Sequence, residues 1–174
     1  MYIFYFVFNL WLLYYCKVIY DTLIINTVYI VRGISGSGKS HYVQDQINDI
    51  SIYNNNTYLE LNIYDILKED ETITSKKIAK TYNDCLNFYI NSLMLGYNHI
   101  YVTNPFISKW EYDNYILLAR QYRYRVVIIE MNCNSIETLK KCFNRSLNVK
   151  NYNLIKNQYD NFEHDKESQV INIE

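Results

Sequence analysis

Short apolar runs alternate along the chain with longer segments in which apolar residues recur every three or four positions. The short runs are typical of strands and cover residues 27–32, 57–63, 99–103, 125–131 and 169–173. The longer segments predict helices over residues 40–50, 75–95, 108–122, 135–147 and 151–162. The run at 125–131 is apolar almost throughout, which is typical of a parallel strand buried on both faces.

The regular alternation of strands and helices predicts an α/β fold. We expect a three-layer sandwich in which helices cover both faces of a mostly parallel sheet. Ligands of such sheets bind at the carboxyl ends of the strands. The polar residues that we expect to meet there are Tyr64, Asp65, Thr103, Asn104 and Glu130.

Two boundary signals refine the predicted helices. Gly96 follows the segment at 75–95 and is a typical helix terminator. Ser108 and Glu111 have the spacing of a capping box, in which each side chain accepts a hydrogen bond from the other residue's backbone. We therefore expect the next helix to begin at this pair.

The segment after the first strand carries a phosphate-binding motif. Residues 33–40 read G-I-S-G-S-G-K-S, which matches G-x-x-x-x-G-K-[ST] between a predicted strand and a predicted helix. Three of the chain's 4 glycines lie in these eight residues. Glycine tolerates the positive φ angles and the close approach of phosphate oxygens that such a loop requires. We call residues 33–40 the phosphate loop.

This motif assigns roles to individual side chains. Lys39 is expected to reach the β- and γ-phosphates of ATP, and the Ser40 hydroxyl is expected to coordinate Mg²⁺. His41 either lies near the nucleotide or is simply packed or solvated. The expected nucleotide-binding set is Gly33, Ile34, Ser35, Gly36, Ser37, Gly38, Lys39, Ser40 and His41.

Composition and charge exclude several classes of protein. With 49% hydrophobic and 20% charged residues, the chain of 174 residues is not expected to be disordered. A formal net charge of −1 excludes a globally basic nucleic-acid binder. The scattered cysteines Cys16, Cys85, Cys133 and Cys142 form no C-x-x-C pair, so we expect reduced thiols in a cytoplasmic protein.

The N-terminal segment 1–24 is unusually apolar, and residues 1–16 carry no charged side chain. This stretch is short for a membrane-spanning helix, which needs about 20 apolar residues, and it lacks the features of a secretory signal. Three interpretations remain open: a membrane anchor that makes contact through residues 1–20, an extra packed element, or translated sequence upstream of the domain. Residues 25–174 form the predicted P-loop kinase-like domain.

Four segments point to a particular family. They are Arg32 to Ser40; Val102-Thr103-Asn104 with Trp110-Glu111; Tyr122 to Val126 with Glu130; and Leu139 and Arg145 with Ile155 and Phe162-Glu163. Residues 28–165, in which they lie, resemble the P-loop kinase domain of the polynucleotide 5′-kinase-like family, an AAA-type ATP-binding domain. The resemblance is strongest to its small Nedd-four-binding branch.

The resemblance implies ATP-dependent transfer of a phosphoryl group, typically to the 5′ hydroxyl of a nucleic acid. It also implies a helical lid near the C-terminus, on which Arg145 would neutralise charge at the γ-phosphate. A solvent-exposed helix residue is the alternative for Arg145. Nearby Lys140, Lys141 and Lys150 would attract a phosphate-rich substrate or form an ordinary solvated helix face.

The chain departs from the family pattern at two strand ends. The family has two consecutive carboxylates after the second strand, the first of which is the general base, whereas this chain has Tyr64-Asp65. Asp65 either takes over that role or is a surface residue. At the third strand, Thr103 replaces the family's aspartate, so Mg²⁺ would depend on Glu130 through a water, or on Ser40 and the nucleotide alone.

These departures leave three functions open. The first is a kinase acting on a nucleic-acid 5′ hydroxyl. The second is a nucleotide-binding module with weak or lost catalysis that acts through protein partners or at a membrane. The third is a kinase with a small-molecule acceptor, because a fold does not determine the substrate.

Overall fold

The computed structural model describes residues 25–51, 57–67 and 75–173. The apolar segment 1–24 and the expected loop at 68–74 lie outside these residues. The strands are β1 Thr27–Arg32, β2 Tyr58–Leu61, β3 His99–Val102, β4 Arg125–Asn132 and β5 Gln169–Asn172. The helices are α2 Lys39–Ser51, α3 Ile63–Ile66, α4 Ser75–Leu95, α5 Trp110–Gln121, α6 Ile136–Arg145 and α7 Tyr152–Asp160.

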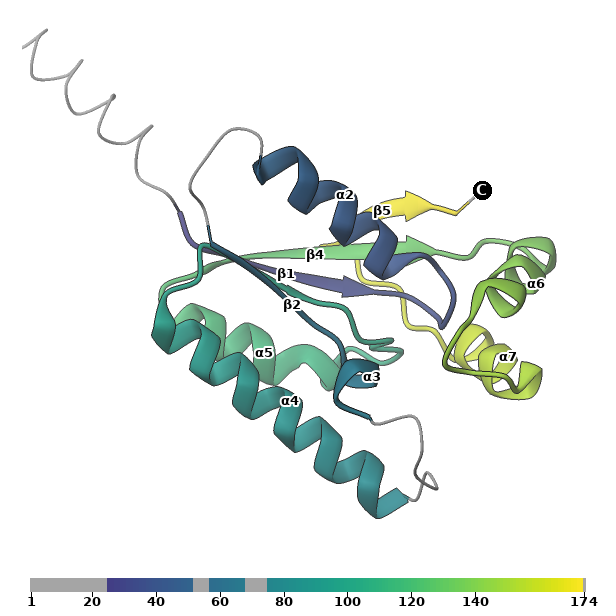
Figure 1. Ribbon diagram of the computed structural model, residues 1–174. Helices are drawn as coiled ribbons and strands as arrows, with labels where there is room; N and C mark the ends of the chain where they lie inside the picture. The colour runs from purple at the N-terminus through teal and green to yellow at the C-terminus, as the bar shows by residue number, and fades with distance from the viewer. Residues whose placement is uncertain (1–24, 52–56, 68–74, 174) are drawn as a thin grey trace, which may run out of the picture.

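The strands form one parallel sheet in the order β2-β3-β1-β4-β5. β1 lies in the centre, where Thr27 pairs with His99 of β3 and with Arg125 of β4. This sheet confirms the parallel α/β prediction. Because all strands run in the same direction, their carboxyl ends meet at the edge from which the phosphate loop leaves β1 (Figure 1).

Helices cover both faces of the sheet, which confirms the predicted sandwich. Successive strand residues point to opposite faces, so Val28 and Ile30 of β1 are buried on one face and Val31 on the other. The first face packs against α4 and α5 through residues that include Tyr89 and Tyr115. The second packs against α2, α6 and α7 (Figure 1).

The second strand ends earlier than predicted. β2 stops at Leu61, and residues 63–66 form the short helix α3 instead of continuing the strand to residue 63. Asn62 caps this helix, because its side chain accepts a hydrogen bond from the Tyr64 N–H at 3.0 Å. The Ile63 N–H donates to the Asn104 side chain at 2.9 Å, which fixes the turn from the neighbouring strand end.

The expected capping box before α5 forms only in part. The helix begins at Trp110, and the side chain of the cap residue Lys109 makes no capping hydrogen bond to the helix. Glu111 still accepts a hydrogen bond from the Ser108 N–H at 3.1 Å. A complete capping box instead joins Ser135 and Thr138 at the start of α6.

Within the described ranges, none of the helices combines the length and the apolar character needed to cross a bilayer. The thiols of Cys85, Cys133 and Cys142 are free, and those of Cys85 and Cys142 are buried.

Candidate functional site

The phosphate loop makes the tight turn that its sequence predicts between β1 and α2. Gly36 and Gly38 adopt φ angles of 79° and 90°, in the left-handed region that favours glycine. The Gly33 N–H donates to the Pro105 carbonyl at 3.0 Å and ties the start of the loop to the segment after β3. The motif and its structural context therefore agree.

Gly36 is required for a second reason, because the loop touches helix α6 directly. A Cβ atom at this position would lie 1.9 Å from the Cys142 carbonyl oxygen and 3.1 Å from the Ser146 nitrogen. No side chain fits such a gap. At Gly38, by contrast, an added Cβ would meet no atom within 4 Å among the described residues.

Lys39 folds back over the loop that precedes it. Its Nζ atom donates to the carbonyl oxygens of Gly33 at 2.8 Å and of Ile34 at 3.0 Å. Burial lowers the pKa of the Lys39 ammonium to about 8, because two neutral carbonyls do not replace the solvation of a full charge. This cation is thus positioned where an anionic ligand would stabilise it.

A cavity of about 450 Å³ lies over the phosphate loop, and we call it the loop cavity. It is lined by Ser35, Gly36, Gly38, Lys39, Ser40, His41, Asn62, Tyr64, Thr103, Arg145, Ser146, Leu147 and Asn148. The cavity thus brings Lys39, Ser40 and His41 of the loop region together with Arg145, the last residue of α6. Two cationic side chains and the first turn of a helix meet here, which suits a polyphosphate.

Tyr64 and Asp65 differ in their relation to this cavity. The Tyr64 hydroxyl lies 3.5 Å from the Ser35 hydroxyl and forms part of the cavity wall. Asp65 is exposed on α3 and is not among the lining residues. In the resembling kinases this position carries the general base. Here it is a tyrosine whose hydroxyl lies next to the phosphate loop.

Glu60, to which the motif assigned no role, lies beside Ser40. Its Oε1 atom accepts a hydrogen bond from the Thr103 hydroxyl at 2.9 Å, and its carboxylate also accepts one from the Ser40 hydroxyl. Burial raises the pKa of Glu60, the two hydroxyls oppose that shift, and the charge of nearby Asp65 adds to it. The hydroxyls of Ser40 and Thr103 with this carboxylate form an oxygen set that suits Mg²⁺.

Gln158 is another residue that sequence reasoning missed. Its side-chain oxygen accepts a hydrogen bond from the Ser35 N–H at 2.9 Å and so connects α7 to the phosphate loop. A glutamine on a helix surface gives no sequence signal of this role. The contact depends on how α7 packs against the sheet.

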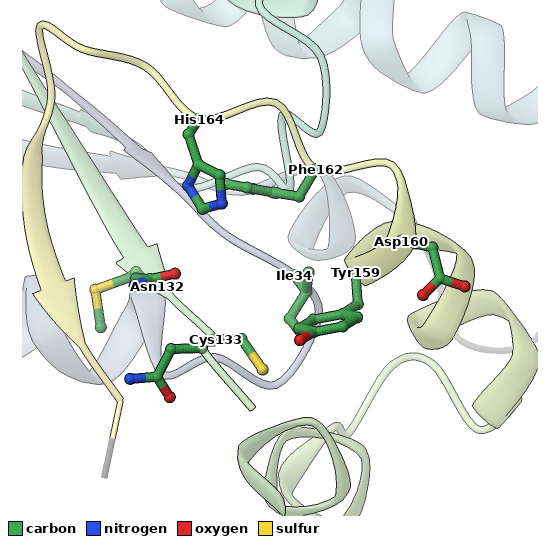
Figure 2. A pocket seen from close by; sticks show the side chains of 9 residues that line it. Ile34, Asn132, Cys133, Tyr159, Asp160, Phe162 and His164 are labelled. Atoms are coloured by element: carbon green, nitrogen blue, oxygen red, sulfur yellow. The ribbon is translucent and has the colours of Figure 1, made fainter. Parts of the chain in front are cut away.

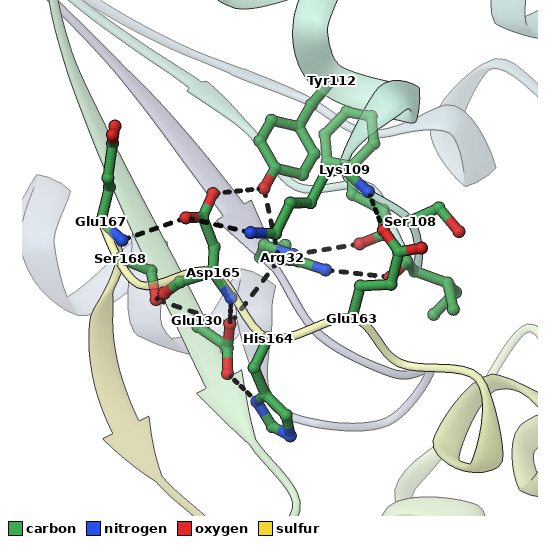
Figure 3. A network of polar contacts seen from close by, with 12 residues as sticks. Arg32, Ser108, Lys109, Tyr112, Glu130, Glu163, His164, Asp165, Glu167 and Ser168 are labelled. Carbon is green, nitrogen blue, oxygen red and sulfur yellow. Dashed lines mark hydrogen bonds and ion pairs between the residues drawn. The ribbon is translucent and has the colours of Figure 1, made fainter.

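Glu130 faces away from the loop cavity, although its strand ends nearby. It is buried in an ion pair with Arg32, with 3.6 Å between Nη1 and Oε2. Oε1 lies 2.5 Å from His164 Nδ1, and the Asp165 N–H donates to Oε2 at 3.2 Å (Figure 3). Because the charge of Arg32 and the hydrogen bonds occupy this carboxylate, the expected contribution of Glu130 to a metal site is not supported.

Arg32 is the centre of this buried cluster. Its guanidinium donates to the carbonyls of Phe106 and Ile107 at 3.0 Å each and packs over the Phe162 ring at 4.4 Å. The arginine that precedes the phosphate loop thus has a structural role, since it ties β1 to the segment after β3 and to the end of α7.

A second cavity, of about 560 Å³, is lined in part by Ile34 (Figure 2). Its wall includes Cys133, Tyr159, Phe162 and His164. None of the described residues that line it is a lysine or an arginine. The lysine and arginine side chains are thus at the loop cavity and not at this one, and they make the loop cavity the better candidate for an anionic ligand.

The fold separates Arg145 from the three lysines that lie near it in the sequence. Lys140, Lys141 and Lys150 are exposed and do not line the loop cavity. Lys141 pairs with Glu137 at 3.6 Å, and the Lys150 ammonium donates to the Ser146 carbonyl at 3.1 Å. Of the four cations, Arg145 is the one that lines the cavity.

Comparison with known families gives a match to the AAA domain over residues 28–160, about three quarters of the chain. Among the curated proteins, no significant match is found.

Several solved structures share the fold. A chain of the Pnkp1/Rnl/Hen1 RNA repair complex is 16% identical with a TM-score of 0.61, over 79% of this chain and 44% of that chain. The APS kinase CysC of Mycobacterium tuberculosis, in complex with AMPPNP and APS, is 12% identical with a TM-score of 0.61, over 85% and 88% of the two chains. A gluconokinase from Sinorhizobium meliloti 1021 is 11% identical with a TM-score of 0.58, over 86% and 83%. This chain thus spans less than half the length of the RNA-repair protein.

Proposed function

The chain belongs to the AAA domain family of P-loop NTPases, and from this premise we propose that it transfers the γ-phosphate of ATP to a hydroxyl group. The preferred acceptor in this proposal is the 5′ hydroxyl of a nucleic acid. The observation that carries the proposal is the loop cavity, in which Lys39, Ser40 and Arg145 line one space at the carboxyl end of β1.

Each of these side chains has a proposed role in phosphoryl transfer. Lys39 releases the Gly33 and Ile34 carbonyls and binds the β- and γ-phosphates, with backbone N–H groups of the loop as further donors. Arg145 neutralises the charge that develops on the transferred group, because a cation at this position stabilises the transition state more than the ground state. His41 borders the same space and contacts the nucleotide.

Mg²⁺ is the expected metal, and the oxygen set at Ser40 fits it. The Ser40 hydroxyl would hold the ion. Bound there, the ion would neutralise phosphate charge during the reaction.

Asp65 is the proposed general base, which polarises the acceptor hydroxyl. Its carboxylate is exposed on α3, one residue after Tyr64 of the cavity wall, and its charge contributes to the raised pKa of Glu60. A general base must come within hydrogen-bonding reach of the hydroxyl, and the exposed position of Asp65 leaves it accessible to a large acceptor.

A nucleic-acid acceptor is favoured by the exposed cations of the lid region. Lys140, Lys141 and Lys150 are exposed around the helix end that carries Arg145. Such cations would attract a phosphate backbone in a salt-dependent manner. The likeness to a chain of an RNA repair complex agrees with this choice of acceptor.

A transfer assay tests the proposal. Purified protein is incubated with ATP labelled at the γ-phosphate, Mg²⁺ and oligonucleotides that end in a 5′ hydroxyl, with Lys39→Ala as the control. We expect label on the oligonucleotide with the natural sequence and none with the variant. Equal label in both samples would reject the proposal.

A second candidate is a nucleotide-binding module with weak or no catalysis, which would act through protein partners. The observation that favours it is Tyr64 in the cavity wall at the position of the family's general base. Tight ATP binding without turnover on oligonucleotides or on small hydroxyl compounds would select this module. Turnover on sugars or nucleosides alone would indicate a small-molecule kinase.

We further propose that residues 25–174 are the unit that binds nucleotide, in the cytoplasm. The free thiols of Cys85, Cys133 and Cys142 suit a reducing compartment. Contact with a membrane through residues 1–20 stays an alternative for the apolar segment, and flotation of the full chain with lipid vesicles would test it.

A further inference from the structure

Glu60 brings a carboxylate to the edge of the loop cavity from a strand that the motif does not include. It lies on β2, opposite Tyr101 in the register with β3. Its carboxylate accepts hydrogen bonds from the Thr103 hydroxyl, at 2.9 Å, and from the Ser40 hydroxyl. One acidic side chain therefore connects the first turn of α2 to the end of β3.

The two residues that contribute these hydroxyl groups both stand at positions associated with Mg²⁺ binding. Ser40 is the residue of the motif that coordinates Mg²⁺, and Thr103 stands where the resembling kinases carry an aspartate. Thr103 is fully buried and lines the loop cavity. Glu60 thus supplies, from the neighbouring strand, the negative charge that β3 itself lacks.

The other carboxylates considered for this role are placed differently. Glu130 is buried against Arg32 and is not among the residues that line the loop cavity. Asp65 is exposed on α3. Of the three carboxylates, Glu60 is the one that contacts Ser40.

One carboxylate is enough for a Mg²⁺ site of the kind that a nucleotide completes. The ion keeps several water ligands and is usually bound by one or two carboxylates together with phosphates. Over the described ranges, no group of three or more His, Cys, Asp or Glu residues could hold a metal by itself. A hydroxyl with one nearby carboxylate is therefore the kind of partial site that a nucleotide would complete.

We propose that Glu60 is the acidic residue that fixes Mg²⁺ beside Ser40 when nucleotide is bound, an inference that rests on the nucleotide binding proposed above. Glu60 acts as a positioning residue, since its contacts are with Ser40 and Thr103. Its charge orients the Ser40 hydroxyl and any water that the ion brings. This arrangement departs from that of the resembling kinases, in which the third strand provides the carboxylate.

A binding experiment tests this role without measuring turnover. The affinity for a non-hydrolysable ATP analogue is measured by calorimetry in EDTA and at a series of free Mg²⁺ concentrations. Three proteins are compared: the natural sequence, Glu60→Gln, and Asp49→Asn. Asp49 is an exposed carboxylate near the far end of α2 and does not line the loop cavity, so its variant controls for the loss of one negative charge.

We expect Glu60→Gln to bind the analogue in EDTA as the natural protein does. The Mg²⁺ concentration needed to strengthen binding should rise by about 10- to 100-fold, the usual effect of losing a residue that orients a metal ligand. Asp49→Asn should need the same Mg²⁺ concentration as the natural protein. Adding Thr103→Asp to the Glu60→Gln variant should restore at least part of the Mg²⁺ response.

Two results would overturn the inference. One is an unchanged Mg²⁺ response in Glu60→Gln. The other is an equal loss of binding with and without metal in a folded Glu60→Gln protein, which would make Glu60 a support of the loop alone. Failure of the natural protein to bind the analogue under any condition would instead reject the proposed function.

A measurement on the natural chain covers the case in which Glu60→Gln does not fold. Fe²⁺ replaces Mg²⁺ in the nucleotide complex, and ascorbate with peroxide then generates radicals that cut the backbone beside the metal. We expect cuts near residues 40 and 60. Cuts near residue 40 without any near residue 60 would contradict the proposal.

Discussion

At the scale of single residues, the charge on Lys39 links nucleotide binding to pH. The pKa of this ammonium is lowered to about 8 because the group is buried. The charged form is therefore disfavoured in the folded protein, and the resulting loss of stability is present below about pH 8 and relieved as the pH rises toward the ordinary lysine value. A bound polyphosphate acts in the opposite direction, because a nearby negative charge raises the pKa.

We predict that binding of an ATP analogue at pH 9 takes up protons, since Lys39 becomes charged only in the complex. Calorimetry in buffers with different ionisation enthalpies measures this uptake. The uptake should decrease toward pH 7, where Lys39 is already charged in the free protein. A pH-independent proton balance would contradict the assignment of Lys39 to the phosphates.

Glu130 allows a second prediction at this scale. Replacing it by Gln leaves the buried charge of Arg32 without its partner, which is expected to lower the free energy of unfolding by about 3–5 kcal/mol. Glu137→Gln is the matched control, because its ion pair with Lys141 is exposed and contributes about 0–1 kcal/mol. Urea unfolding of both variants measures the difference, and equal effects would contradict the structural role of the Arg32 cluster.

At the scale of elements, the phosphate loop and helix α6 act as one packed unit. Two of the three glycines of the loop, Gly36 and Gly38, separate the effect of backbone conformation on stability from that of close contact. Gly38→Ala meets no described atom within 4 Å, so its positive φ alone should destabilise the protein by about 1–3 kcal/mol. Gly36→Ala adds a collision with the Cys142 carbonyl to the same kind of strain.

We therefore predict that Gly36→Ala lowers both the free energy of unfolding and the affinity for ATP more than Gly38→Ala does. Urea unfolding and calorimetry of the two variants provide the comparison. The reverse order would show that the loop and α6 are not in contact in solution.

The elements that could be predicted from sequence are those with local signals. β1, the loop and α2 follow from the glycine spacing and the apolar run, and α4 follows from its periodicity and Gly96. The end of β2 could not be predicted, because Asn104, which follows β3, stabilises the turn at Ile63. The role of Glu60 could not be predicted for the same reason, since its proximity to Ser40 depends on how distant parts of the chain pack.

At the scale of the whole molecule, nucleotide binding should stabilise the folded state by mass action. An ATP analogue at 100 times its dissociation constant should add about 2.7 kcal/mol to the free energy of unfolding. Urea unfolding with and without the analogue and Mg²⁺ measures this gain. Lys39→Ala should remove it.

Removal of residues 1–24 tests the proposed domain boundary by the same measurement. All described residues that line the loop cavity follow residue 34, so the shortened chain should show the same gain in stability as the full chain. A smaller gain would place part of the binding unit in the apolar segment.

The fold class was predictable from the alternation of strands and helices, but the order of the strands was not. Parallel pairing joins segments that are far apart in sequence, and apolar periodicity says nothing about which strands are neighbours. For the candidate site, the motif predicted Lys39 and Ser40 and the family resemblance predicted Arg145, and the structure brings all three to the loop cavity. The contact of Gln158 with the loop depends on tertiary packing alone.

The central position of β1 has a consequence for synthesis on the ribosome. β1 and its phosphate loop emerge first among the strands, yet both neighbours of β1 end only at residues 102 and 132. At usual translation speeds of about 5–20 residues per second, the strand waits on the order of 5 to 20 seconds for its second partner. During that interval its apolar side chains have no sheet to join, so we expect nascent chains to engage chaperones until β4 has been translated.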